Sequence, residues 1–137
     1  MGQKPVPRSQ RPGAGSVKRV LVVDDHDLNR GLVRSILERR GFEVHDAEDG
    51  VSAVALAHSL RPSLILMDMA MPLKDGYTAT RELKQDPATS FIPIVGLSAL
   101  AMRGDEQKAR EAGVDEYLTK PIERVRLEEM VDRLSRA

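Results

Sequence analysis

The chain contains no cysteine and no tryptophan, and its aromatic residues are limited to two tyrosines and two phenylalanines. Without cysteine, a disulfide framework and a thiolate zinc site are both excluded, and a reducing compartment is compatible with the sequence. So few aromatic residues argue against a surface on which nucleic-acid bases stack.

Long hydrophobic runs and a net charge are also missing. The longest apolar runs hold only a few residues, and no apolar segment stands at the N-terminus, so neither a membrane-spanning helix nor a signal peptide is predicted. The 21 basic and 21 acidic residues cancel, which argues against a strongly basic nucleic-acid binder. We therefore expect a soluble cytoplasmic protein with no direct nucleic-acid partner and no membrane partner.

The 137 residues are enough for one domain with its own hydrophobic core and a tail. Residues 1–16 are rich in proline, glycine, serine and glutamine, and they carry three basic residues without an acid. This composition predicts a disordered basic tail over 1–16 and one folded domain over 17–137. We expect no further domain after the folded one, so the protein should act by binding something else.

Two apolar runs each lead directly into acidic residues. Residues 64–67 precede Asp68, and residues 20–23 precede Asp24 and Asp25. A short apolar run without alternation, bounded by turn residues, is typical of a strand buried on both faces of a parallel sheet. Both acidic ends would lie at the carboxyl edge of one sheet, where α/β proteins place their chemistry.

Five predicted strands alternate with five predicted helices. The strands near residues 42–45 and 115–119 alternate apolar and polar residues, which indicates sheet edges, whereas the strand at 92–97 is apolar throughout. This pattern predicts an α/β, flavodoxin-like, doubly wound fold with a five-stranded parallel sheet in the order 2-1-3-4-5 and helices on both faces.

Two of the predicted helices have distinct features. Asp27 is the expected N-cap of the first helix. The residues expected on the buried face of that helix are Leu28, Leu32, Val33, Ile36 and Leu37. The fourth helix, Gly104 to Ala112, has few apolar residues, so we expect it to be the most weakly held, with its preceding loop 99–103.

The predicted strand order gathers five polar side chains at one edge of the sheet. They are Asp24, Asp25, Asp68, Ser98 and Lys120. Carboxylates roughly 5 Å apart at an effective dielectric constant near 20 repel by about 3 kcal/mol per pair, so a proton or cation must offset that cost. No histidine is expected in the cluster, and His26 is interpreted as an exposed residue at a helix start. Oxygen ligands suit Mg²⁺ or Mn²⁺, and such an ion bridges carboxylate to phosphate.

These residue types point to phosphoryl chemistry. An aspartate beside a divalent ion, a lysine and a hydroxyl is equipped to attack phosphorus and form an acyl phosphate. Lys120 and the ion offset charge on the transferred oxygens, and Ser98 can donate a hydrogen bond to one of them.

Four motifs, VLVVDD, LILMDMAMPLKDGY, IPIVGLSALA and YLTKPI, together resemble the receiver domain of two-component response regulators, over about Val17 to Ala137. Residues 101–122 are also similar to single-domain regulators and to receivers of hybrid kinases. The resemblance implies that Asp68 accepts a phosphoryl group from a histidine kinase or a histidine phosphotransfer protein. It also implies a metal site formed by Asp24, Asp25, Asp68 and the main-chain carbonyl of Ala70.

The resemblance implies further roles and a signalling output. Ser98 and Tyr117 would be switch residues, Lys120 the phosphate partner, and the Lys120–Pro121 bond cis. The protein would be no enzyme beyond its own phosphorylation and dephosphorylation. We expect the helix at 104–112, the strand at 115–119 and the closing helix to form the face that binds an unknown downstream protein. The side chain of Ala70 is too small to hold or block an attacking water.

Two alternative functions share parts of this pattern. A haloacid-dehalogenase-like phosphatase also forms an aspartyl phosphate, but it requires a second aspartate two residues after the nucleophile, where this chain has Ala70. A flavodoxin-like electron carrier would need a Ser/Thr-rich phosphate loop and aromatic residues around a flavin. Arg30, Arg34 and Arg39 on the first helix form a candidate docking face for a kinase or phosphotransfer bundle, although an ordinary solvated face explains them equally well.

Overall fold

The computed structural model describes residues 18–71, 73–99 and 104–135, and every structural statement below refers to these ranges. The tail predicted over 1–16 and residues 100–103 of the loop expected before the fourth helix lie outside them. Along the described chain, strands and helices alternate in the order β1 Arg19–Val23, α1 Asp27–Arg39, β2 Glu43–Ala47, α2 Gly50–Leu60, β3 Leu64–Asp68, α3 Gly76–Gln85, β4 Ile94–Ser98, α4 Asp105–Ala112, β5 Glu116–Thr119 and α5 Arg124–Leu134.

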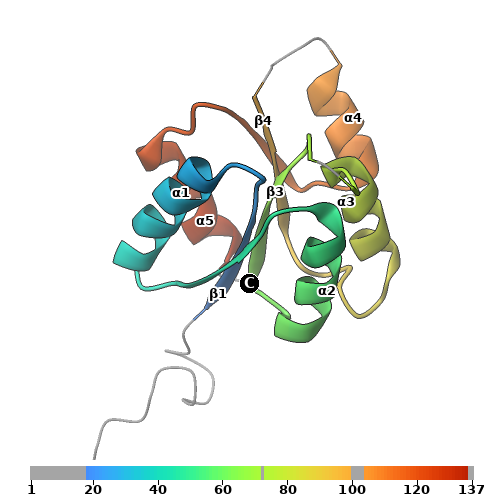
Figure 1. Cartoon of the computed structure of the whole chain (residues 1–137), viewed down its shortest axis with the longest axis horizontal. Helices are drawn as coiled ribbons and strands as arrows, with labels where there is room; N and C mark the ends of the chain where they lie inside the picture. Colours follow the sequence, from blue (N-terminus) through green and yellow to red (C-terminus); the bar gives the residue numbers. More distant parts are fainter. Residues whose placement is uncertain (1–17, 72, 100–103, 136–137) are drawn as a thin grey trace, which may run out of the picture.

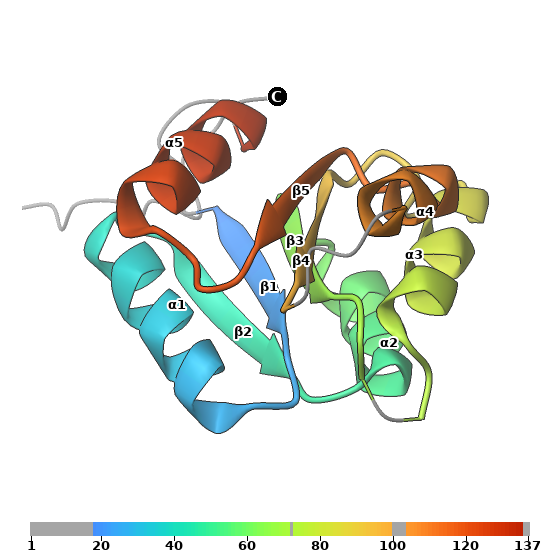
Figure 2. The same ribbon diagram turned by 90° about the horizontal axis from the view of Figure 1, so that it is seen from above.

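The five strands form one parallel sheet in the order β2-β1-β3-β4-β5, as predicted (Figures 1 and 2). The central strands β3 and β4 are buried along their whole length, whereas β2 and β5 at the edges are partly exposed. Because central strands of a doubly wound sheet are covered on both faces, their sequences are apolar without alternation.

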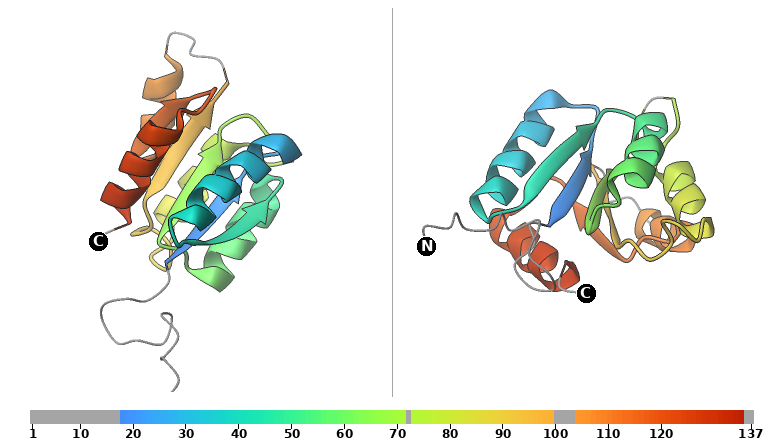
Figure 3. Two further views of the ribbon diagram at one scale, coloured as in Figure 1. Left: turned by 90° about the vertical axis from the view of Figure 1, so that its left-hand side faces the viewer. Right: turned by 90° about the horizontal axis from the view of Figure 1, so that it is seen from below.

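Helices cover both faces of the sheet (Figures 2 and 3). α2, α3 and α4 pack with one set of strand residues, and α1 and α5 pack with the other. In β1, Leu21 and Val23 face the first layer while Val20 and Val22 face the second, as the two-residue period of a strand requires. No helix among the described ranges is long and apolar enough to cross a lipid bilayer.

The strand register aligns the carboxyl ends that carry the polar side chains. Val23 at the end of β1 pairs with Met67, so Asp24 follows at the level of Asp68 on β3. Asp68 pairs with Leu97 of β4, and Ser98 pairs with Thr119 of β5, directly before Lys120. The predicted clustering at one edge therefore follows from the pairing itself.

Two predictions for α1 were wrong. His26, rather than Asp27, is the N-cap, and Asp27 is the first helical residue, where it forms an ion pair with Arg30. Leu28 and Leu32 were expected in the core, but they are 87% and 56% exposed. The sheet covers only the stripe that contains Val33, Ile36 and Leu37, so the two leucines lie on the outer surface of the helix.

Candidate functional site

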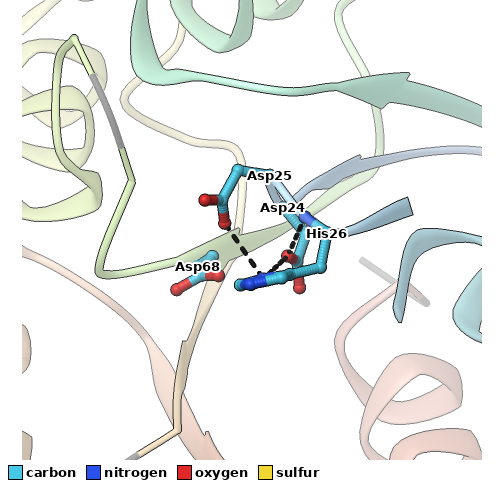
Figure 4. A group of neighbouring side chains, drawn as sticks. All are labelled: Asp24, Asp25, His26 and Asp68. Carbon is cyan, nitrogen blue, oxygen red and sulfur yellow. Dashed lines mark hydrogen bonds and ion pairs between the residues drawn. The ribbon is translucent and has the colours of Figure 1, made fainter. Parts of the chain in front are cut away.

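Two buried carboxylates lie side by side at the carboxyl edge of the sheet. Asp24 follows β1 and Asp68 ends β3, and the two residues are only 2% and 3% exposed. Asp25 is more accessible, with 31% of its side chain exposed. Each of these residues and His26 offers a ligand atom within 4.8 Å of the others (Figure 4).

Lys120 joins the two buried carboxylates. Its Nζ donates to Oδ2 of Asp24 at 2.8 Å and to Oδ2 of Asp68 at 2.9 Å. A hydrogen bond from its N–H to the Ser98 carbonyl at 2.7 Å fixes the backbone at Lys120. The Lys120–Pro121 bond is cis, as expected from the resemblance. One ammonium group thus offsets part of the charge of two buried acids.

The turn after β3 is organised around the second oxygen of Asp68. The backbone N–H of Ala70 donates to Oδ1 of Asp68 at 2.9 Å. Gly76, at the start of α3, packs against the backbone of this turn, because a Cβ at Gly76 would stand 2.2 Å from the Asp68 carbonyl oxygen. The turn therefore needs glycine at this position to pack against the site.

Burial and hydrogen bonding shift the proton affinities of the site. Burial disfavours the charged form of Asp68 and raises its pKa above the ordinary value, although Ala70 and Lys120 donate to it. Burial acts in the same direction on Asp24, but hydrogen bonds from Lys120 and the His26 backbone outweigh it and lower the pKa of Asp24. Burial also disfavours the charged form of Lys120, yet its two carboxylate partners outweigh burial and raise its pKa.

The two residues expected to switch lie on adjacent strands. Ser98 is buried at the end of β4. Tyr117 of β5 is 8% exposed and packs in the core layer that contains Ala109 of α4. Its hydroxyl is buried without a hydrogen-bond partner among the described residues. A cavity of about 550 Å³ borders Tyr117 between α4 and α5.

His26 was missed as a member of the cluster. It lies at the start of α1 and its side chain is 68% exposed, in agreement with the sequence interpretation. Its ring nevertheless lies against the carboxylates, with Nδ1 3.3 Å from Oδ1 of Asp24 and 3.2 Å from Oδ1 of Asp25. The ring therefore belongs to the cluster, which the sequence analysis had limited to oxygen ligands. The available sequence signal was its place directly after two acids.

The charges at this site fit a divalent cation. Three carboxylates are gathered within a few ångströms of one another, and Lys120 is the positive group bonded to the buried pair. An ion of charge +2 would balance the remaining two negative charges. The carboxylates of Asp24, Asp25 and Asp68 are hard oxygen ligands of the kind that Mg²⁺ and Mn²⁺ prefer. Fold and site together define a doubly wound α/β protein with a cluster of acidic residues at its switch point.

Comparison with known proteins agrees with this class. Residues 20–132 match the response regulator receiver domain. Response regulator PleD of Caulobacter vibrioides is 44% identical over 118 residues, which are 86% of this chain and 26% of PleD. The polar-differentiation response regulator DivK of Brucella anthropi is 40% identical over 105 residues, which are 77% of this chain and 85% of DivK. The chain thus spans about a quarter of PleD and most of DivK.

Solved structures show the same architecture. The receiver domain of sensor histidine kinase PA1611 from Pseudomonas aeruginosa superposes with a TM-score of 0.82 at 34% identity, covering 88% of this chain and 99% of that domain. That structure holds a magnesium ion coordinated in its active-site cleft. The present chain belongs to the response regulator receiver domain family, and it is a receiver domain of two-component phosphorelay signalling. Nothing in these comparisons favours the phosphatase alternative.

Proposed function

We propose that Asp68 accepts a phosphoryl group from a histidine kinase or a histidine phosphotransfer protein. The observation that supports this role is the placement of a buried carboxylate between two donors, with Lys120 Nζ 2.9 Å from Oδ2 and the Ala70 N–H 2.9 Å from Oδ1. A carboxylate oxygen of Asp68 forms a bond to phosphorus while the bond from phosphorus to the partner's histidine nitrogen breaks. The imidazole leaves with that electron pair.

The residues around Asp68 stabilise the transferred group. Lys120 places its positive charge beside the oxygens that gain charge in the transition state. The hydroxyl of Ser98, at the end of the neighbouring strand, is the donor proposed for one phosphoryl oxygen. Mg²⁺ or Mn²⁺, held by Asp24, Asp25, Asp68 and the carbonyl of Ala70, would supply positive charge that neutralises the phosphoryl oxygens. Ala70 itself offers no side chain to hold a hydrolytic water.

The test of this role is labelling with acetyl phosphate and Mg²⁺, followed on a phosphate-retarding gel. Wild type should shift and Asp68→Asn should not. Asp75→Asn is a matched control, because Asp75 caps α3 through a hydrogen bond from the N–H of Thr78 that asparagine can also accept. Equal labelling of wild type and Asp68→Asn would mean that the acceptor is another residue. Turnover of many equivalents of a small phosphoester would instead favour the phosphatase.

Phosphorylation is proposed to change the face formed by α4, β5 and α5. The new group adds negative charge and acceptor oxygens at Asp68, which should draw the Ser98 hydroxyl toward it. The space vacated would be open to Tyr117, whose buried hydroxyl has no partner among the described residues. α4 is a suitable moving element, because only Ala109 and Ala112 of this helix are buried.

Hydrogen exchange measured with and without a phosphate mimic tests this output face. The amides of α4 and β5 should change their exchange rates, whereas those of α2, on the far side of α3 from α4, should not. An unchanged α4-β5-α5 face in the phosphorylated form would rule out the proposed switch.

The phosphoryl donor is proposed to dock beside α1. The arginines expected to form this surface are largely engaged within the domain, since Arg30 donates to the Asp24 carbonyl at 2.6 Å and Arg34 to Asp46 at 2.8 Å. Leu28 and Leu32 are instead exposed on α1, the helix that begins beside the acidic site at His26, and a cavity of about 290 Å³ lies beside Leu32 between α1 and α5. An exposed apolar stripe on a helix suits contact with a partner helix.

A further inference from the structure

His26 gives this acidic site a nitrogen atom. The backbone N–H of His26 donates to Oδ1 of Asp24 at 2.8 Å, which closes a tight turn between β1 and α1. The turn directs the ring back over the acids, and Figure 4 shows it beside the carboxylates of Asp24 and Asp25 with Asp68 nearby. The ring is at the mouth of the site, because 68% of the side chain is exposed.

The spacing of these atoms matches the shell of a small ion. Two neighbouring ligand atoms, each bound at about 2.1 Å, lie about 3.0–3.4 Å apart in octahedral or tetrahedral geometry. Nδ1 of His26 is 3.3 Å from Oδ1 of Asp24 and 3.2 Å from Oδ1 of Asp25. These distances are compatible with one ion shared by the imidazole nitrogen and both carboxylates, since the ligand atoms of the group all lie within 4.8 Å of one another.

Whether a ligand atom is oxygen or nitrogen determines which metal ions it binds more strongly. Mg²⁺ prefers oxygen and gains little from an imidazole, whereas imidazole suits Zn²⁺, Ni²⁺ and Cu²⁺. Histidine is also a common zinc ligand in combination with aspartate. A receiver site that has only oxygen ligands has no imidazole nitrogen to favour Zn²⁺ over Mg²⁺.

We infer that His26 is a metal-selectivity residue, which makes the cation site bind Zn²⁺ through Nδ1 together with the carboxylates of Asp24 and Asp25. The inference rests on the proposed metal site, since it concerns the ion that occupies the same pocket. Zn²⁺ and Mg²⁺ then compete for the pocket, and the ratio of their affinities depends on His26.

Calorimetric titration of the metal-free protein with Zn²⁺ and separately with Mg²⁺ tests this inference. In His26→Gln, the ratio of Zn²⁺ affinity to Mg²⁺ affinity should fall by at least about tenfold, the loss that even removal of an outer partner of a metal ligand often causes. The control is a double variant, His45→Gln with His58→Gln. These two rings pair with Glu43 and Asp86 and lie outside the cluster, so the control should keep the wild-type ratio.

Ring ¹⁵N resonances provide a second measurement that does not depend on affinity. Zn²⁺ should shift the Nδ1 resonance of His26 at one molar equivalent. An unchanged affinity ratio in His26→Gln, or a shift confined to His45 or His58, would overturn the inference.

Failure of this inference is distinguishable from failure of the proposed function. If Mg²⁺ still binds and Asp68 is still labelled by acetyl phosphate, an unchanged affinity ratio removes only the role of His26. If Asp68 is not labelled while Zn²⁺ binds through His26, the metal selectivity stands and the phosphoryl acceptor must be sought elsewhere.

Discussion

Asp68 carries an electrostatic cost that its neighbours only partly offset. It shares the ammonium group of Lys120 with Asp24, so one positive charge serves two buried carboxylates. Burial raises the pKa of Asp68, which means that folding disfavours its charged form. For an acid with a raised pKa, this cost is absent at pH values below the ordinary pKa, grows as the pH rises through the raised pKa and is fully present above it.

Asp68→Asn should therefore stabilise the metal-free protein. Asparagine keeps an oxygen that can accept from the Ala70 N–H but removes the charge that repels Asp24. We expect the free energy of unfolding at pH 7 to rise, because the substitution removes a buried charge that folding disfavours. Urea unfolding in the presence of a chelator measures the change. A loss of stability would show that Lys120 alone compensates both carboxylates.

At the scale of single elements, the ends of helices are set by backbone geometry. α4 ends at Gly113, whose φ is +117°, and a Cβ there would stand 2.8 Å from Cγ of Lys84. Lys84 has little freedom to move away, because its Nζ donates to the Ile92 carbonyl at 2.7 Å and to Asp115 at 2.9 Å. The Lys84 side chain thus links α3 to the segments just before β4 and β5, close to the C-terminal end of α4.

Substitution by alanine should have opposite effects at two glycines. Gly113→Ala should lower the free energy of unfolding by about 1–2 kcal/mol, because an L-residue is strained at positive φ. Gly31→Ala, within α1, should raise it by about 0.5–1 kcal/mol, because alanine favours a helix interior and its Cβ meets no atom within 4 Å. Thermal or urea unfolding of both variants checks the prediction. A change of the free energy of unfolding in the same direction for both variants would contradict the prediction.

The sheet was predictable because burial on both faces leaves a direct trace in the sequence. The runs that form β1, β3 and β4 are apolar without alternation, and the alternating strands at the edges complete the order. The surface of α1 was less predictable. Leu28 and Leu32 form one stripe and Val33, Ile36 and Leu37 another, and periodicity alone does not say which stripe the sheet covers. The two exposed leucines are therefore visible only in three dimensions.

The candidate site was likewise predictable from the sequence only in part. Asp24, Asp68 and Lys120 could be placed together, because strand order fixes where strand ends meet. The ring of His26 could not be placed, because its direction depends on the turn closed by its own N–H on Asp24. Sequence spacing does not specify the geometry of such a turn, so it does not specify the neighbours of the ring.

At the scale of the whole molecule, the formal net charge of zero conceals a local excess of negative charge. The site gathers Asp24, Asp25 and Asp68 near Lys120, at the carboxyl ends of β1, β3 and β5. Binding of a divalent cation should therefore couple to the stability of the entire fold. A ligand that binds only the folded state raises the free energy of unfolding. Once the ligand concentration exceeds the dissociation constant, the increase grows with the logarithm of the ratio of the two.

Mg²⁺ at ten times its dissociation constant should raise the free energy of unfolding of the wild type by about 1.4 kcal/mol. Asp25→Asn should lose most of this increment. Its metal-free stability should remain within about 0.5 kcal/mol of wild type, because Asp25 is an exposed side chain outside the core. Asp75→Asn, which removes the same charge at the start of α3, should keep the full Mg²⁺ increment. Urea unfolding of the three proteins with Mg²⁺ and with a chelator separates these outcomes. An undiminished increment in Asp25→Asn would exclude this carboxylate from the cation site, because stabilisation by the ion reports its contacts in the folded state.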